Sequence, residues 1–231
     1  MAKHYSGVKL HDVGITPVNL TPETIKAEPM LFRAEHAFAF KHGGWLTRRF
    51  LDEATGIWGN LDGCIIDSRH HMLMPGMYPC IPGWHTDDAP RDPKRWGGQP
   101  NIFKPEYETE HILCVVDSGT ESLTEFASGD VCLPEFFVIR KHEEDGESFY
   151  KSVDHLINRY PYAAFNQPPE FVSVKSGQIA EFNVHSWHRG QPAKQRGFRW
   201  FIRITRNSRH KVQNELRSNA QVYITDSSYG W

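Results

Sequence analysis

Residues 198–206 read Phe-Arg-Trp-Phe-Ile-Arg-Ile-Thr-Arg, a pattern that indicates a β-strand. Side chains alternate between the two faces of a strand, so Arg199, Phe201, Arg203 and Thr205 share one face. The other face is apolar and comprises Phe198, Trp200, Ile202 and Ile204. An arginine inside so apolar a strand costs free energy unless it meets an anion. The stretch therefore predicts either a buried anion site or an edge strand with a solvated arginine face.

Similar short apolar runs, separated by Gly and Pro, fill the chain from residue 63 onward. Besides 198–206, the predicted strands are 64–68, 70–74, 111–117, 122–127, 135–140, 170–174 and 178–184. One helix is predicted over 149–160, where apolar residues fall on one helical face and Pro161 ends the helix. Many short strands separated by turns are typical of a β-sandwich or barrel.

The first 62 residues have a mixed pattern. Thr21 followed by Pro22 predicts a helix start, with Thr21 as the N-cap. Residues 45–54 predict a short helix that ends before Gly56. We expect one structural domain, with a mixed helical segment (1–62) packed on a mainly β core (63–231).

Composition narrows the class of protein. The chain has 231 residues with 26 basic and 28 acidic side chains, so its net charge of −2 argues against duplex nucleic acid as a partner. No apolar run reaches the ~18 residues of a membrane-spanning helix. The N-terminus lacks the apolar core of a secretory signal, so we expect a cytoplasmic protein without a membrane partner. The four cysteines form no CxxC pair, which excludes a zinc ribbon, whereas 13 histidines favour a nitrogen and oxygen metal site.

The triplet His85-Thr86-Asp87 follows Pro82-Gly83-Trp84. In an extended segment, residues two apart point to the same side, so His85 and Asp87 can share one metal ion. A His-x-Asp triplet is weak evidence alone, because a solvated turn produces it equally well. Asp88 points the other way and is interpreted as a solvated carboxylate.

Two further histidines, His185 and His188, follow the predicted strand 178–184. Two histidines and one carboxylate on one face of a metal form the facial triad of non-haem Fe(II) oxygenases, which leaves open coordination positions. The arginine-bearing strand comes next in the chain.

This order of motifs resembles the Fe(II)/2-oxoglutarate-dependent dioxygenase superfamily, whose fold is a double-stranded β-helix, or jelly roll. The resemblance includes Met74-Pro-Gly-Met-Tyr78 ahead of the triplet, the hairpin-like stretch 119–126, and Gly177-Gln-Ile-Ala-Glu-Phe182 ahead of His188-Arg-Gly190. It spans about 65–206 and leaves the first 60 residues uncovered.

The resemblance implies His85, Asp87 and His188 as Fe(II) ligands. It also implies that Arg199 binds the distal carboxylate of 2-oxoglutarate. His185 is the rival third ligand, and Arg203 is the rival arginine. Phe201 stands where many members of the superfamily carry Ser or Thr, so we expect the missing hydroxyl to come from Tyr78 or Thr124.

The implied activity is that of a dioxygenase that uses Fe(II), 2-oxoglutarate and O₂ to hydroxylate a small molecule or a protein side chain. Two alternatives remain open: a non-catalytic jelly-roll binding or structural protein with a vestigial metal site, and a cupin-type metalloenzyme. We further expect the segment 88–106 and the helix 149–160 to cover the substrate side of the metal; the alternative is that this helix packs on the outer face of a sheet. The sequence does not identify the substrate or the oligomeric state.

Overall fold

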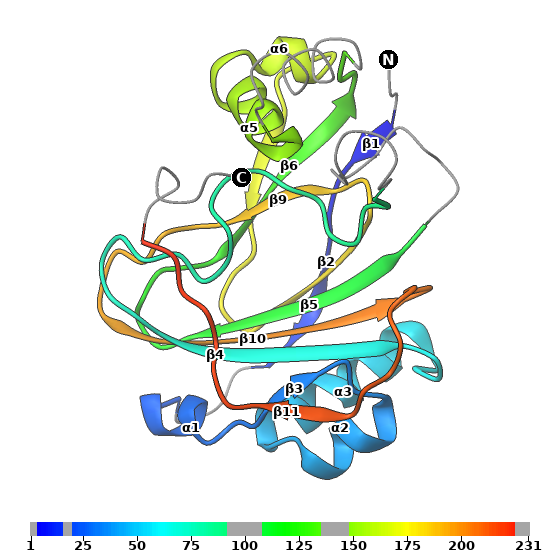
Figure 1. Cartoon of the computed structure of the whole chain (residues 1–231), viewed down its shortest axis with the longest axis vertical. Coiled ribbons are helices and arrows are strands. Elements are labelled where there is room, and N and C mark those ends of the chain that lie inside the picture. The colour runs from blue at the N-terminus through cyan, green and yellow to red at the C-terminus, as the bar shows by residue number, and fades with distance from the viewer. Residues whose placement is uncertain (1–3, 16–19, 92–107, 135–147, 225–231) are drawn as a thin grey trace.

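The computed structural model describes residues 4–15, 20–91, 108–134 and 148–224. Its framework is mainly β, with antiparallel sheets in a jelly-roll arrangement, which confirms the predicted fold class. Helices cover the outer faces of the two larger sheets, at opposite ends of the view in Figure 1. The predicted strand 135–140 lies outside the described residues.

The largest sheet has the strand order β2-β8-β5-β10-β4. Its strands are β2 (Lys9–Gly14), β4 (Ile65–Leu73), β5 (Glu110–Asp117), β8 (Gln178–Asn183) and β10 (Gly197–Arg206). Strand β10 pairs with β4 on one side and with β5 on the other. The arginine-bearing strand is therefore an interior strand, and the alternative of a solvated edge strand is wrong.

The second sheet is built around β6 (Thr124–Val131). Strand β6 pairs with β1 (His4–Ser6), β7 (Glu170–Ser173) and β9 (Trp187–Gly190). A small separate pair joins β3 (Met30–Phe32) to β11 (Glu215–Arg217). The helices are α1 (Pro22–Lys26), α2 (His36–His42), α3 (Trp45–Trp58), α5 (Phe149–Arg159) and α6 (Pro161–Ala164).

Three apolar clusters hold these layers together. Helices α1, α2 and α3 pack on the apolar face of β10, where Trp200 meets Phe50 edge to face with ring centroids 6.4 Å apart. A smaller cluster that includes Leu113, Phe126 and Phe182 joins the two sheets. The third cluster packs α5 and α6 against the smaller sheet. The polar face of β10 thereby looks into the space between the sheets, which is where the site lies.

Several predicted boundaries are wrong. The predicted strands 64–68 and 70–74 form one continuous strand, β4, because Arg69 pairs with Phe201 of β10 in an unbroken register. Helix α3 runs through Gly56 and ends at Trp58, since a glycine in a helix costs only about 1 kcal/mol. Gly59, with φ +77°, provides the left-handed turn that ends this helix. Strand β6 begins at Thr124 and continues to Val131, later than the predicted 122–127.

Other predicted elements are confirmed. Thr21 caps α1, with its hydroxyl accepting from the Thr24 amide at 3.2 Å. Helix α5 spans 149–159, close to the predicted 149–160. None of the helices in the described ranges is long and apolar enough to span a membrane. All four cysteines are free thiols.

Candidate metal centre

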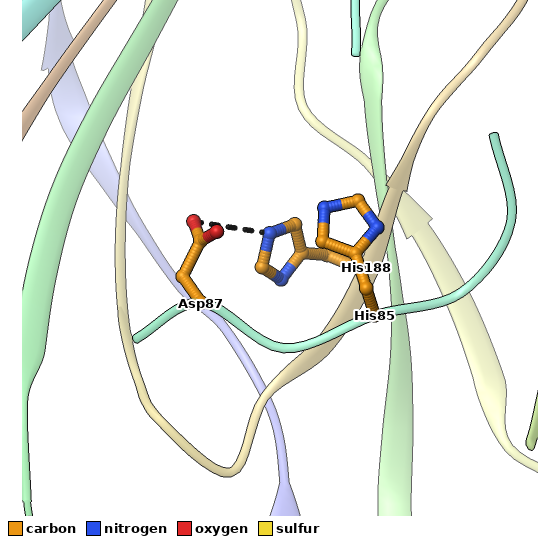
Figure 2. A group of neighbouring side chains, drawn as sticks. All are labelled: His85, Asp87 and His188. Atoms are coloured by element: carbon orange, nitrogen blue, oxygen red, sulfur yellow. Dashed lines mark ion pairs between the residues drawn. The ribbon is translucent and has the colours of Figure 1, made fainter. Parts of the chain in front are cut away.

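His85, Asp87 and His188 meet in the space between the two sheets (Figure 2). Strand β9 carries His188, and the segment that contains His85 runs antiparallel beside it. The two residues exchange backbone hydrogen bonds of 2.9 Å in both directions. One ligand atom from each of the three side chains lies within 4.8 Å of the others, and His188 Nε2 is 3.3 Å from Asp87 Oδ2. These are the three residues that the sequence put forward as metal ligands.

The hydrogen bonds of the two imidazole rings fit a metal site. Nδ1 of His85 lies 2.9 Å from the carbonyl oxygen of Gly83, and Nδ1 of His188 lies 2.9 Å from that of Ser186. A carbonyl only accepts, so each Nδ1 must carry the proton and each Nε2 keeps a lone pair. Metal-ligating histidines are oriented in this way, by a hydrogen bond from the ring nitrogen that does not bind the metal. Burial, followed by the effect of His188, lowers the pKa of His85 to about 4.

Arg203 orients the carboxylate of the triad. Its guanidinium forms an ion pair with Asp87, and its other terminal nitrogen lies 3.9 Å from Asp88. Burial alone would raise the pKa of Asp87, but Arg203 and then His188 hold it well below its usual value. Arg203, the rival arginine of the sequence analysis, therefore faces the candidate ligands. This ion pair links residues far apart in sequence and carried no local signal.

Arg199 lies in the same cavity without a carboxylate partner. The residue is 3% exposed, and no carboxylate of the described residues lies within 4.0 Å of its guanidinium. Its Nε donates to the Ser122 carbonyl at 2.7 Å, and its Nη2 lies 3.4 Å from Thr124 Oγ1. Burial lowers the pKa of Arg199 to about 10. The cavity has a volume of about 340 Å³ and is lined by Arg199, Thr124 and all three candidate ligands.

Two other residues from the sequence analysis lie elsewhere. The backbone of Tyr78 forms a bridge with that of Tyr223, and Tyr78 is not among the described residues that line the cavity. The ring of His185 packs on His4 with centroids 4.8 Å apart and does not join the triad. Thr124 is thus the hydroxyl, of the two suggested, that lies beside Arg199.

Helix α5 fixes the segment that carries His85 and Asp87. The Trp84 amide donates to Asp154 at 2.8 Å, and the Trp84 indole donates to Asn158 at 3.1 Å. The hydroxyl of Tyr150 donates to the Thr86 carbonyl at 2.6 Å. No sequence pattern predicts these contacts, because the periodicity of a helix does not reveal which loop the helix will contact.

The structure describes only part of the expected cover over the metal. Segment 92–106 lies outside the described residues. Tyr150 of α5 lines a second cavity of about 700 Å³, which shares His85 and Asp87 with the first. The apolar residues of α5 pack against the smaller sheet. The helix therefore serves both as packing on a sheet and as one wall beside the site.

The Tyr150 contact gives a testable expectation. Tyr150→Phe removes the donor to the Thr86 carbonyl, which lies between two candidate ligands. We expect metal affinity to fall by about tenfold, because outer contacts of this kind hold ligands in position. Competition with a metal-binding dye measures the affinity. Tyr160→Phe, at an exposed tyrosine that ends the same helix, is the matched control and should leave affinity unchanged. Equal affinities for the two variants would contradict the role given to α5.

Comparisons with known proteins find similarity to solved structures only. No family model and no curated protein matches this chain. Among solved structures, iron-bound HygX from Streptomyces hygroscopicus is similar at 13% identity and a TM-score of 0.33, covering 63% of this chain and 57% of HygX. EvdMO1 is similar at 14% identity and a TM-score of 0.34, covering 72% of this chain and 34% of EvdMO1. Apo ThoJ, a non-haem monooxygenase, is similar at 12% identity and a TM-score of 0.32, covering 80% of this chain and 75% of ThoJ.

The chain thus spans less than two thirds of the length of HygX and of EvdMO1.

Proposed function

We propose that this chain is a non-haem Fe(II), 2-oxoglutarate-dependent oxygenase that hydroxylates a small molecule or a protein side chain. One observation carries the proposal. Two oriented imidazoles and one carboxylate converge in a cavity that also holds a buried arginine with no carboxylate partner among the described residues. The two imidazoles and the carboxylate suit a divalent metal, and the buried arginine suits a cosubstrate that carries a carboxylate.

His85, Asp87 and His188 would hold the iron. A site with two histidines and one carboxylate leaves open positions on the metal, which suits Fe(II). When bound, Fe(II) supplies the activation of O₂, coupled to the oxidative decarboxylation of 2-oxoglutarate. The contribution of the chain is to hold the ligands in place. It does so through the carbonyls of Gly83 and Ser186 and through Arg203.

Arg199 would hold the distal carboxylate of 2-oxoglutarate. The guanidinium is a rigid fork that matches a carboxylate and forms two parallel hydrogen bonds with it. A buried arginine without an anion is costly, so filling this site relieves an existing penalty. The Thr124 hydroxyl lies beside the guanidinium and would donate a further hydrogen bond.

The second cavity would receive the primary substrate. It has a volume of about 700 Å³ and is lined by His85, Asp87 and Tyr150. A volume in this range suits a small molecule or one side chain of a protein substrate. No residue of β10, which carries Arg199, is among the described residues that line this cavity, so the substrate would reach the metal without occupying the place of the cosubstrate.

Turnover tests the proposed function. Purified protein supplied with Fe(II), 2-oxoglutarate, O₂ and ascorbate is expected to form succinate and CO₂ slowly, with ascorbate giving the two electrons that the absent substrate would otherwise supply. Removing the metal by chelation should abolish the reaction, and Fe(II) alone should restore it. Mass spectrometry of succinate measures both results.

The outcome separates the alternatives. Protein that binds metal but neither binds nor consumes 2-oxoglutarate would favour the cupin-type enzyme. Protein that binds neither metal nor 2-oxoglutarate would favour the non-catalytic jelly-roll protein.

A further inference from the structure

The cavity-facing side of β4 carries a row of polar side chains. Asp67, Arg69 and His71 alternate with residues on the helix-covered face. All three line the cavity of about 340 Å³ that contains Arg199, here called the inner cavity; the second cavity, of about 700 Å³, is called the outer cavity. Each lies directly across from a residue of β10: Asp67 from Arg203, Arg69 from Phe201, and His71 from Arg199. Asp67 already has a partner, since it lies 3.3 Å from Arg217.

Arg69, like Arg199, has no carboxylate partner among the described residues, whereas Arg203 and Arg217 each have one. No carboxylate of the described residues lies within 4.0 Å of the Arg69 guanidinium, although the side chain is half-buried. Burial, followed by the nearby charge of Arg217, lowers the pKa of Arg69. A cation that is partly desolvated and repelled by other cations is stabilised by a bound anion.

The net charge of the inner cavity also favours the binding of an anion. Within the described residues its lining contains two carboxylates, Asp67 and Asp87, and five guanidinium groups: Arg33, Arg69, Arg199, Arg203 and Arg217. A metal dication together with the 2-oxoglutarate dianion adds no net charge. The excess of three positive charges therefore persists after both have bound, and a further anion would reduce it.

The position of Arg69 indicates which molecule brings that anion. Arg69 lines both the inner cavity and the larger outer cavity, so this residue lies where the two meet. Arg199, by contrast, lines the inner cavity and is not among the described residues around the outer one. A molecule in the outer cavity can reach Arg69 while 2-oxoglutarate occupies Arg199.

We propose that the primary substrate is a small anionic molecule whose carboxylate or phosphate group binds Arg69. This inference rests on the proposed function, because it assigns Arg199 to the cosubstrate and leaves Arg69 for the substrate. A guanidinium forms paired hydrogen bonds with either a carboxylate or a phosphate. Arg69 would thus select for negative charge at the entrance to the metal.

Binding of three probes of similar shape tests this inference. Benzoate and phenyl phosphate carry the two anionic groups, and benzamide is neutral. Calorimetry would follow each probe binding to protein loaded with Zn(II), which does not turn over, and with saturating 2-oxoglutarate. We expect at least one of the two anions to bind about tenfold or more tightly than benzamide. The stronger of the two identifies the group that the site prefers.

Variants then assign the preference to one side chain. Arg69→Gln should bind the anions and benzamide equally, while its affinity for 2-oxoglutarate stays unchanged. Arg69→Lys should retain part of the preference, and it provides the comparison if the glutamine variant does not fold. Arg48→Gln is the control, because Arg48 is exposed and lies outside both cavities.

Three results would overturn the inference. They are equal binding of anions and benzamide by the wild-type protein, no binding of either anion, and an anion preference that survives in Arg69→Gln. A loss of 2-oxoglutarate affinity in Arg69→Gln would also overturn it, because Arg69 would then belong to the cosubstrate. Failure of wild-type protein to bind 2-oxoglutarate would instead count against the proposed function.

Discussion

His188→Ala protein is expected to lose stoichiometric Fe(II) binding and, with it, consumption of 2-oxoglutarate. The imidazole is one of three ligands, so its loss should lower metal affinity by more than the roughly 10–100-fold typical of an outer contact. Equilibrium dialysis measures the metal, and succinate formation measures turnover. Circular dichroism would establish that the variant is folded.

His185→Ala is the matched control for this prediction. His185 lies three residues from His188 but packs on His4 and is outside the triad. This variant should bind Fe(II) as the wild type does. Loss of metal in His185→Ala with retention in His188→Ala would show that the third ligand is misassigned.

Arg199→Lys is expected to raise the KM for 2-oxoglutarate while metal binding stays nearly intact. Lysine keeps the positive charge but loses the rigid fork that pairs with a carboxylate. Loss of one charge-assisted hydrogen bond costs about 1.5–3 kcal/mol, which corresponds to a rise in KM of roughly 10–100-fold. Steady-state succinate formation at varied 2-oxoglutarate concentration measures the effect.

Arg203→Lys provides the comparison on the same strand. Arg203 pairs with Asp87, so this variant should weaken metal binding and affect 2-oxoglutarate only indirectly. If Arg203→Lys gives the isolated rise in KM and Arg199→Lys does not, the two arginines have exchanged roles.

The parts of the fold that sequence predicts well are those with a local signal. Strand β10 alternates over its full length, and its apolar and polar faces lie where the alternation places them. Strands β1, β3 and β11 have three residues each and owe their conformation to partners across a sheet, so no local pattern predicts them. Gly56 predicts a helix end, yet φ and ψ of glycine are compatible with a helix, and the packing of α3 outweighs the penalty.

The site likewise combines residues that a local sequence pattern predicts with residues that only tertiary structure brings together. The triplet at 85–87 is local and could be found directly, whereas His188 needed the resemblance to a family. The ion pair of Arg203 with Asp87 and the contact of Tyr150 with Thr86 depend on tertiary structure. Arg69 has no comparable signal, because residues 67–71 of β4 are all polar and their sequence does not show which of them share a face.

Anaerobic absorption spectroscopy tests the central claim most directly. Wild-type protein is loaded with one equivalent of Fe(II) under nitrogen and titrated with 2-oxoglutarate. The account predicts a weak metal-to-ligand charge-transfer band in the visible region that saturates at one 2-oxoglutarate per iron. His188→Ala should give no band, and Arg199→Lys should give it only at higher 2-oxoglutarate concentration. Absence of the band in wild-type protein that has bound Fe(II) would contradict the account.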